Sequence, residues 1–227
     1  MVVVGWSPPP GNDGVPTDTA IRVTFSDFPD PDTISVSSML LTSGFFRVPE
    51  SYRVDMLTRS VLMTPISDLT ADVGYAVTVT RGVRSLAGCA APTVHSSFIT
   101  GDGPIGTARP PSPTFADIAP IFSARCAGGC HAAPDGTCLD APVAGLSLCP
   151  TEARAALVDI PSRQLSDIAL VVPYNAARSY LIRKIVPATP DGGPVPGTFG
   201  QREPPDAPLP DDQIRAISDW IDGGALP

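Results

Sequence analysis

Apolar and polar residues alternate along the first hundred residues of the chain. Residues 20–25 place Ile21, Val23 and Phe25 on one face of an extended segment, and residues 74–80 follow the same alternation. Other β-rich segments lie at residues 38–42, 51–55, 60–64 and 95–100, and turn clusters such as residues 8–14 separate the segments. About seven short strands without a strong helical stretch predict an antiparallel β-sandwich.

From residue 114 onward, apolar residues recur at the spacing of short helices. Thr114 stands three residues before Asp117, which predicts a capping box, and Pro120 is expected to kink the helix that follows or to delay its start. Residues 151–158 and 179–185 predict two further short helices.

The last helix has the clearest pattern. An aspartate, Asp211 or Asp212, is expected to cap it, and Gly223 is expected to end it. Its apolar stripe consists of Ile214, Ile217, Trp220 and Ile221. Because short helices and long loops leave a poor apolar core, we expect another group to fill the middle of this part of the chain.

The sequence therefore predicts a multidomain protein. An all-β domain of residues 1–101 is followed by a linker of residues 102–113, in which prolines and glycines predict a semi-stiff connection. A mainly α-helical domain with long loops takes residues 114–227.

Charge excludes several partners. The chain carries 15 basic and 23 acidic residues, a net charge of −8, and neither half has a basic stripe. Contacts with phosphates need such a stripe, so we expect no nucleic acid and no anionic membrane surface as partner. No apolar run approaches the ~20 residues that span a bilayer, so we expect no transmembrane segment. Residues 1–6 lack the basic region of a signal peptide, so the chain is expected to be cytosolic or to have lost a leader.

The segment of residues 126–131, Cys-Ala-Gly-Gly-Cys-His, carries the candidate chemistry. Two cysteines followed at once by a histidine are typical of c-type haem attachment, in which both thiols add to vinyl groups and the histidine binds iron. Here three residues rather than two separate Cys126 from Cys130, and we expect Gly128 and Gly129 to absorb the extra residue through positive φ. Two other interpretations stay open: a disulfide between the cysteines, or a zinc site with His131 and a further cysteine.

Each half of the chain resembles a different protein family in the order of its short motifs. Residues 1–101 resemble a bacterial Ig-like domain in the order of residues 14–16, 21–26, 62–65, 69, 74–79 and 98–101. Such domains usually act as spacers or adhesive modules of secreted proteins, so this half indicates location rather than chemistry. Residues 114–227 resemble small class I-like cytochrome c domains of secreted bacterial proteins in residues 115–122, the cysteine–histidine motif, and residues 145–148, 179–185 and 209–225.

The second resemblance implies one covalent haem c, attached through Cys126 and Cys130, with His131 as an iron ligand. In the family a methionine just before the last helix is the second ligand, whereas Glu203 stands at that position here. Three arrangements stay open: Glu203 binds the iron, it stands off an open site, or it is a solvated loop residue. At an open site Glu203 and Arg202 would resemble a peroxidase pocket, with a proton shuttle and a cation beside the breaking bond.

Four other residues are candidates for the haem site. Arg183, Lys184 and Arg202 are candidate partners of the haem propionates, and Trp220 is a candidate indole donor to the same groups. Ordinary surface or core packing is the alternative for each. A ligand from the other half, His95, is also weighed, although a lone histidine on a predicted edge strand is more often a surface residue.

The remaining cysteines indicate the compartment. Cys138 and Cys149 are expected to form a disulfide, and both disulfides and haem attachment point to an oxidising compartment outside the cytoplasm. Cys89 is left over, and we expect it to be buried, with an intermolecular bridge as the alternative.

We interpret the chain as a periplasmic or secreted one-electron carrier with a redox partner protein, rather than an enzyme. The alternatives are a peroxidase-like or small-ligand-binding haem protein and an adhesion module without haem.

Overall fold

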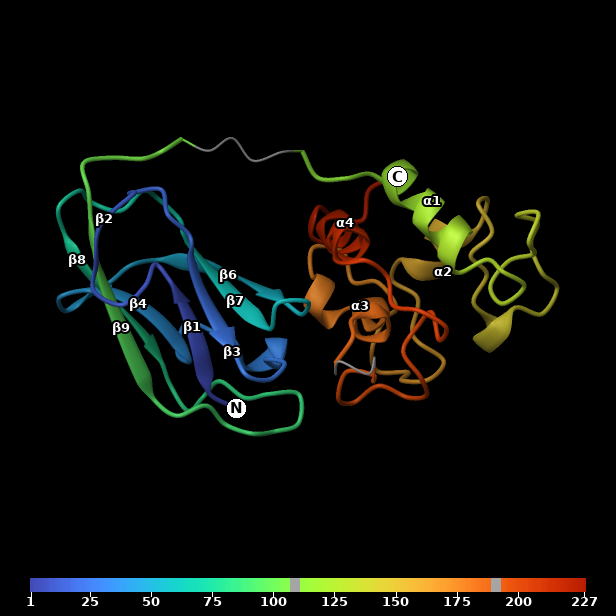
Figure 1. The fold of residues 1–227 in the computed structure, drawn as a ribbon, viewed down its shortest axis with the longest axis horizontal. Helices are drawn as coiled ribbons and strands as arrows, with labels where there is room; N and C mark the ends of the chain where they lie inside the picture. Colours follow the sequence, from blue (N-terminus) through green and yellow to red (C-terminus); the bar gives the residue numbers. More distant parts are fainter. Residues whose placement is uncertain (107–110, 189–192) are drawn as a thin grey trace. The chain divides into compact units, whose positions relative to one another are not determined.

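The computed structural model describes residues 1–106, 111–188 and 193–227. The chain divides into two compact units, Met1–Arg109 and Pro110–Pro227 (Figure 1). The boundaries predicted from the sequence, residues 101 and 114, lie on either side of this division. Part of the predicted linker, residues 107–110, lies outside the described residues.

The first unit is a β-sandwich of two sheets (Figure 1). The strand order is β1-β3-β7-β6 in the four-stranded sheet and β2-β9-β8-β4-β5 in the five-stranded sheet. The elements are β1 (Val3–Ser7), β2 (Asn12–Val15), β3 (Ile21–Phe25), η1 (Pro31–Thr33), β4 (Met39–Ser43), β5 (Phe46–Arg47), β6 (Glu50–Asp55), β7 (Ser60–Pro65), β8 (Gly74–Val79) and β9 (Val94–Thr100).

The alternation seen in the sequence decides which side chains enter the core. Strand β3 buries Ile21, Val23 and Phe25, and β8 buries its tyrosine and both valines. In the antiparallel pairing of β3 with β7, Ile21 faces Met63 and Val23 faces Val61. Since these side chains fill the space between the sheets, the prediction of a sandwich is confirmed.

Strand β2 departs from the prediction. Three of its four residues lie in the segment 8–14, where the sequence predicts a turn. The strand pairs in parallel with β9. The prediction of a wholly antiparallel sandwich is therefore wrong. Asn-Asp-Gly has low β-propensity, so only the distant partner strand makes this segment extended.

Two side chains of the first unit also differ from expectation. Strand β9 lies between β2 and β8, so His95 is not on an edge strand; it is exposed, with Nδ1 at 2.9 Å from Oγ1 of Thr78. Cys89 is a free thiol and is exposed, not buried. Its amide donates to Oγ of Ser85 at 3.2 Å, which holds the cysteine in a surface turn.

The start of the predicted linker is bound to the sandwich. The Asp18 carboxylate accepts hydrogen bonds from the amides of Ile105 at 3.0 Å and Gly106 at 2.9 Å. The amide of Thr17 donates to the carbonyl of Gly103 at 3.2 Å. Residues 103–106 therefore belong to the first unit rather than to a free connection.

The described part of the second unit contains short helices separated by loops. They are α1 (Phe115–Arg125), η2 (Val143–Gly145), α2 (Ala153–Leu157), η3 (Ala176–Arg178), α3 (Tyr180–Ile185) and α4 (Asp211–Asp222). Helix α1 packs against α4, and the rings of Phe115 and Trp220 have their centroids 5.6 Å apart. The stripe predicted for α4 is confirmed, because Ile214, Ile217, Trp220 and Ile221 are all buried.

The helix ends confirm one prediction and correct two. The capping box exists: the Thr114 amide and hydroxyl donate to Asp117 Oδ2 at 2.7 and 2.8 Å. Helix α1 begins before Pro120, so of the two effects expected of this proline the delayed start is wrong. A proline removes only one helical hydrogen bond, and the cap together with burial of Ile118 and Phe122 offsets that loss. The cap of α4 is Pro210 rather than an aspartate.

Candidate functional site

The cysteine–histidine motif begins where α1 ends. Cys126 is the C-cap of α1, and its amide donates to the carbonyl of Phe122 at 2.9 Å. The next residues form a turn in which Gly128 has φ of 20° and Gly129 has φ of 87°. The prediction that these glycines adopt positive φ is confirmed. The turn brings Cys130 and His131 back beside the end of the helix.

Both cysteines and the histidine line one cavity of about 550 Å³. This volume lies within the range of small-molecule and cofactor sites. The lining comes from α1, the motif, the segment around η2, the loop that follows α2, helix α3 and the loop before α4. Its apolar members include Phe122, Leu146, Leu148, Leu157, Leu170 and Ile185. The expected gap in the second unit is thus present, and Glu203 also lines it.

His131 is fixed by its neighbours. Its Nδ1 lies 3.0 Å from the carbonyl oxygen of Leu146. A carbonyl only accepts hydrogen bonds, so in the neutral imidazole this contact selects the tautomer with the proton on Nδ1 and the lone pair on Nε2. The backbone supports the same arrangement, since the amide of Leu148 donates to the carbonyl of His131 and that of Val143 to the carbonyl of Cys130, both at 2.8 Å. Metal-binding histidines typically have a partner of this kind on their other nitrogen.

The two motif cysteines are free thiols. Burial, with a smaller contribution from the negative charge of Glu203, raises the pKa of the Cys126 thiol to about 11. Among the residues that the structure describes, the ligand atoms of Cys126, Cys130 and His131 do not gather within 4.8 Å of one another. Tetrahedral zinc with bonds of about 2.3 Å to sulfur needs such a cluster, so this geometry does not favour the zinc interpretation.

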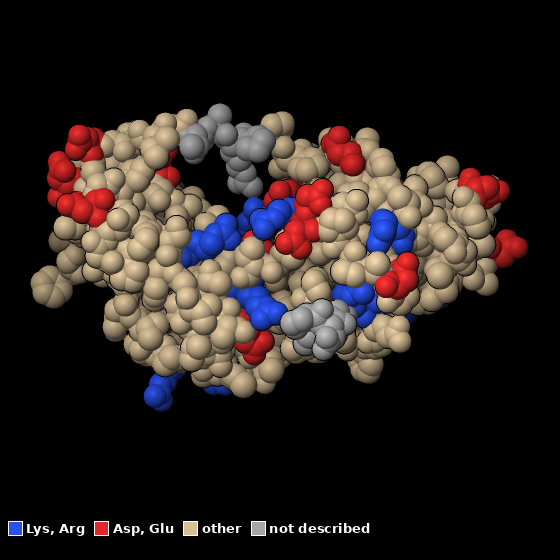
Figure 2. Space-filling view, viewed as in Figure 1, with Lys and Arg blue, Asp and Glu red and all other residues tan. Residues whose placement is uncertain are grey.

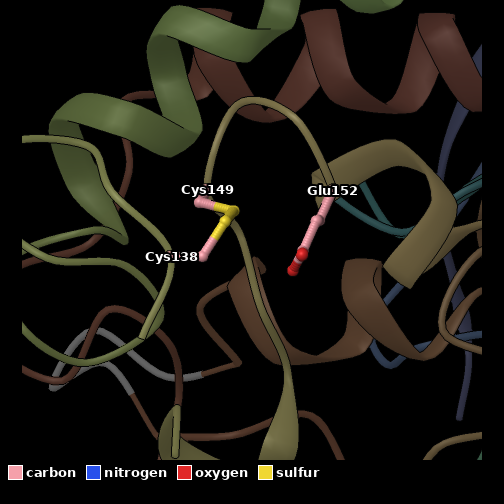
Figure 3. Close-up of side chains that lie close together, drawn as sticks. All are labelled: Cys138, Cys149 and Glu152. Carbon is pink, nitrogen blue, oxygen red and sulfur yellow. A yellow bond between two sulfur atoms is a disulfide. The ribbon is translucent and has the colours of Figure 1, made fainter. Parts of the chain in front are cut away.

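The other cysteines of the second unit form a disulfide (Figure 3). Cys138 and Cys149 have their Cα atoms 5.1 Å apart, and the predicted bridge is present. The carboxylate of Glu152 lies close to the two sulfur atoms, but these are committed to each other, so the group is not a metal site. The disulfide joins the ends of the segment that contains Leu146, the partner of His131.

Glu203 lies opposite a buried lysine. Its Oε1 is 4.0 Å from Nζ of Lys184 on α3, and its amide donates to the carbonyl of Lys184 at 2.7 Å. Lys184 Nζ also donates to the carbonyls of Phe199 and Gln201. Burial lowers the pKa of the Lys184 ammonium, and the negative charge of Glu203 partly opposes this shift. Lys184 therefore binds the loop before α4 through its ammonium group and its carbonyl.

Three residues that the sequence analysis gave as candidate haem contacts do not line the described cavity. The indole of Trp220 donates to the carbonyl of Leu226 at 2.8 Å, and the residue is fully buried beside α1. Arg202 is buried and its Nη1 donates to the carbonyl of Pro204 at 2.6 Å. Neither these two residues nor Arg183 lines the described cavity.

Polar groups that the sequence analysis missed do line the cavity. They include Ser162, Arg163, Gln164, Tyr180, Arg125 and Asp206. The Tyr180 hydroxyl donates to Oε1 of Gln164 at 2.8 Å. The guanidinium of Arg163 packs against Gly145: a Cβ atom at position 145 would lie only 1.8 Å from Nη1 of Arg163. Gly145 also has φ of 63°, which favours glycine. The sequence around Gly145 does not indicate that an arginine packs against this glycine.

Charged side chains of both signs are interspersed on the visible face (Figure 2). On the face shown in Figure 2, uncharged side chains cover most of each unit. None of the helices in the described residues combines the length and apolar character needed to cross a bilayer.

Comparisons with solved structures give low scores. The N-terminal part of the bacterial S-layer protein SbsC is 17% identical, with 44% of this chain and 23% of that chain covered and a TM-score of 0.36. The chain therefore spans about a quarter of that structure. The copper resistance protein PcoC from Escherichia coli is 16% identical (43% and 97% covered, TM-score 0.35), and CopC from Methylosinus trichosporium OB3b is 14% identical (48% and 98%, 0.35). At these values none of them supports a functional argument.

No curated protein matches the chain. The family model of the bacterial Ig-like domain matches residues 1–100. This range covers the two sheets described above. Residues 1–100 therefore form a bacterial Ig-like domain.

Proposed function

We propose that residues 114–227 bind one haem c and that the protein is a one-electron carrier outside the cytoplasm. The observation that carries the proposal is the arrangement around His131. Its Nδ1 is held by the Leu146 carbonyl at 3.0 Å, which leaves Nε2 as the lone pair for a metal. Two free thiols, Cys126 and Cys130, line the same cavity of about 550 Å³.

The residues present fit the group. Cys126 and Cys130 would attach it, His131 would ligate its iron, and the apolar lining would exclude water from one face. Arg163 and Tyr180, which line the cavity, offer polar contacts for carboxylates. When bound, haem c supplies an iron that cycles between ferric and ferrous states. The Ig-like domain is, in this proposal, a spacer that fixes the carrier near a redox partner at the cell surface or in the periplasm.

The geometry does not favour a peroxidase-like site. That mechanism needs Arg202 beside the reacting oxygen atoms, but its guanidinium bonds to the carbonyl of Pro204 and does not line the described cavity. Glu203 does line the cavity and is the candidate second ligand. A carboxylate is a hard anionic donor and favours ferric iron relative to a thioether.

Production of the full chain with a periplasmic haem c maturation system tests the proposal. We expect one haem per chain, visible as a Soret band and as haem staining after denaturing electrophoresis. The C126S/C130S variant should lose covalent haem, and H131A should lose the low-spin iron signature. The matched control is C89S, which removes the exposed free thiol of the first unit and should keep both. A matured wild-type chain without a Soret band would overturn the proposal.

The role of Glu203 has its own test. In E203M a thioether replaces the carboxylate, so the variant should gain a low-spin His/Met spectrum and a higher reduction potential. D206N, which removes another carboxylate that lines the cavity, should leave the spectrum unchanged. An unchanged spectrum in E203M would show that residue 203 does not reach the iron. Rapid binding of carbon monoxide and peroxide turnover by the wild type would favour the open-site alternative.

A further inference from the structure

Lys184 makes an unusual set of contacts with the loop before α4. It is the single lysine of the chain, it lies in the last turn of α3, and it is only 8% exposed. Its Nζ donates to the carbonyls of Phe199, at 2.9 Å, and Gln201. Its own carbonyl accepts the amide of Glu203 at 2.7 Å. One residue thus holds both the backbone carbonyls and a backbone amide of residues 199–203.

The side chain of Glu203 is held from the same point. Its Oε1 lies 4.0 Å from Nζ of Lys184, and both residues line the cavity. A buried ammonium is costly unless its protons are used, and here two carbonyls accept hydrogen bonds from it while a carboxylate 4.0 Å away opposes its charge. The Glu203 side chain remains about 40% exposed, so its position depends on the lysine rather than on tight packing.

We propose that Lys184 is a positioning residue for Glu203 in the candidate haem site. It fixes residues 199–203 against α3 and sets where the Glu203 carboxylate lies in the cavity. That the cavity holds haem rests on the proposed function. The brace, by which we mean the contacts of Lys184 with residues 199–203, does not depend on it. Lys184 is therefore assigned to the protein's own loop and not to a haem propionate.

A double-variant cycle of K184M, E203Q and K184M/E203Q tests the assignment on the full matured chain. We expect K184M to change the ferric absorption spectrum and the reduction potential, and to do so much less when residue 203 is already glutamine. The cycle is needed because removal of a positive charge near iron shifts the potential by itself. The matched control is a second cycle with D206N in place of E203Q. In that cycle K184M should have the same spectral effect whether residue 206 is aspartate or asparagine. K184R, which keeps the charge and the donors, should restore most of the wild-type spectrum.

Hydrogen exchange separates this proposal from the function of the cavity. In the full chain as purified, with or without haem, K184M should speed exchange of the Glu203 amide at least tenfold relative to amides of α4. If the wild-type chain takes up no haem during maturation, the proposed function is overturned, whereas faster exchange of the Glu203 amide in K184M would still support the role of Lys184 in holding the loop. Equal exchange in wild type and K184M, or additive spectral effects of K184M and E203Q, would overturn the assignment of Lys184.

Discussion

The anchoring of α3 depends on one buried hydroxyl. Ser179 immediately precedes α3 and has no exposed surface. Its Oγ donates to the carbonyl of Asn175 and accepts the amide of Val172, both at 2.9 Å. The change S179A removes both hydrogen bonds and leaves two backbone groups without this partner. Helix α3 carries Tyr180 and Lys184, so this hydroxyl fixes one wall of the cavity.

The magnitude follows from those two bonds. A hydrogen bond contributes about 1 kcal/mol net, and a buried group left without a partner costs about 1–3 kcal/mol. We therefore expect S179A to lower the free energy of unfolding of the second unit by about 2–4 kcal/mol. For a domain of this size the midpoint of thermal unfolding would fall by roughly 8–16 °C.

Unfolding in guanidinium chloride, followed by tryptophan fluorescence, measures the change. The chain has two tryptophans, and W6F leaves the buried Trp220 as the reporter of the second unit. The control S166A changes an exposed serine in the same unit and should stay within about 0.5 kcal/mol of the parent. A loss below about 1 kcal/mol in S179A, at an unchanged m-value, would refute the reasoning.

Three further predictions concern the second unit. In the chain made without haem attachment, Cys126 should react with iodoacetamide at pH 8 about two orders of magnitude more slowly than in the unfolded chain, since burial raises its thiol pKa to about 11; equal rates by peptide mass spectrometry would contradict this. The C138S/C149S variant should lose about 2–3 kcal/mol in guanidinium unfolding, because the bridge closes a loop of sequence separation 11; a loss near zero would show that the loop stays ordered without the bridge. Hydrogen bonds from Thr114, first from its amide, hold the pKa of Asp117 below its usual range, so this contribution is present above the unfolded pKa and is lost as pH falls through the folded pKa. A helix signal in D117N should therefore depend less on pH between 6 and about 3, and an identical pH dependence would contradict the capping role.

Features that depend on residues close together in the sequence could be predicted from it. The alternation in β3 and β8 and the stripe of α4 are decided by side chains a few residues apart, and each is confirmed. The thiols and imidazole of the motif are likewise close in sequence, and the structure places them on one cavity.

The rest depends on contacts between distant segments. Nothing near residues 12–15 indicates a strand, because β2 exists through its pairing with β9. Arg163 reaches the cavity from a loop without periodicity, so no pattern marks it, and the predicted helix of residues 179–185 does not by itself show that Tyr180 faces the cavity. Trp220 has the donor that a propionate requires, but the nearby carbonyl of Leu226 uses that donor instead.

The parallel pairing of β2 with β9 also bears on how the Ig-like domain forms. Sheet β1-β3-β7-β6 draws only on residues 3–65, whereas the other sheet joins Asn12–Val15 to Val94–Thr100. Closing such a long loop costs entropy before any contact repays it, and contacts distant in sequence slow folding. We therefore expect the first sheet to form early as the chain is made and the second to close only after residue 100 has emerged. A nascent chain that stops short of β9 would leave the edge of β8 open to pairing with other chains.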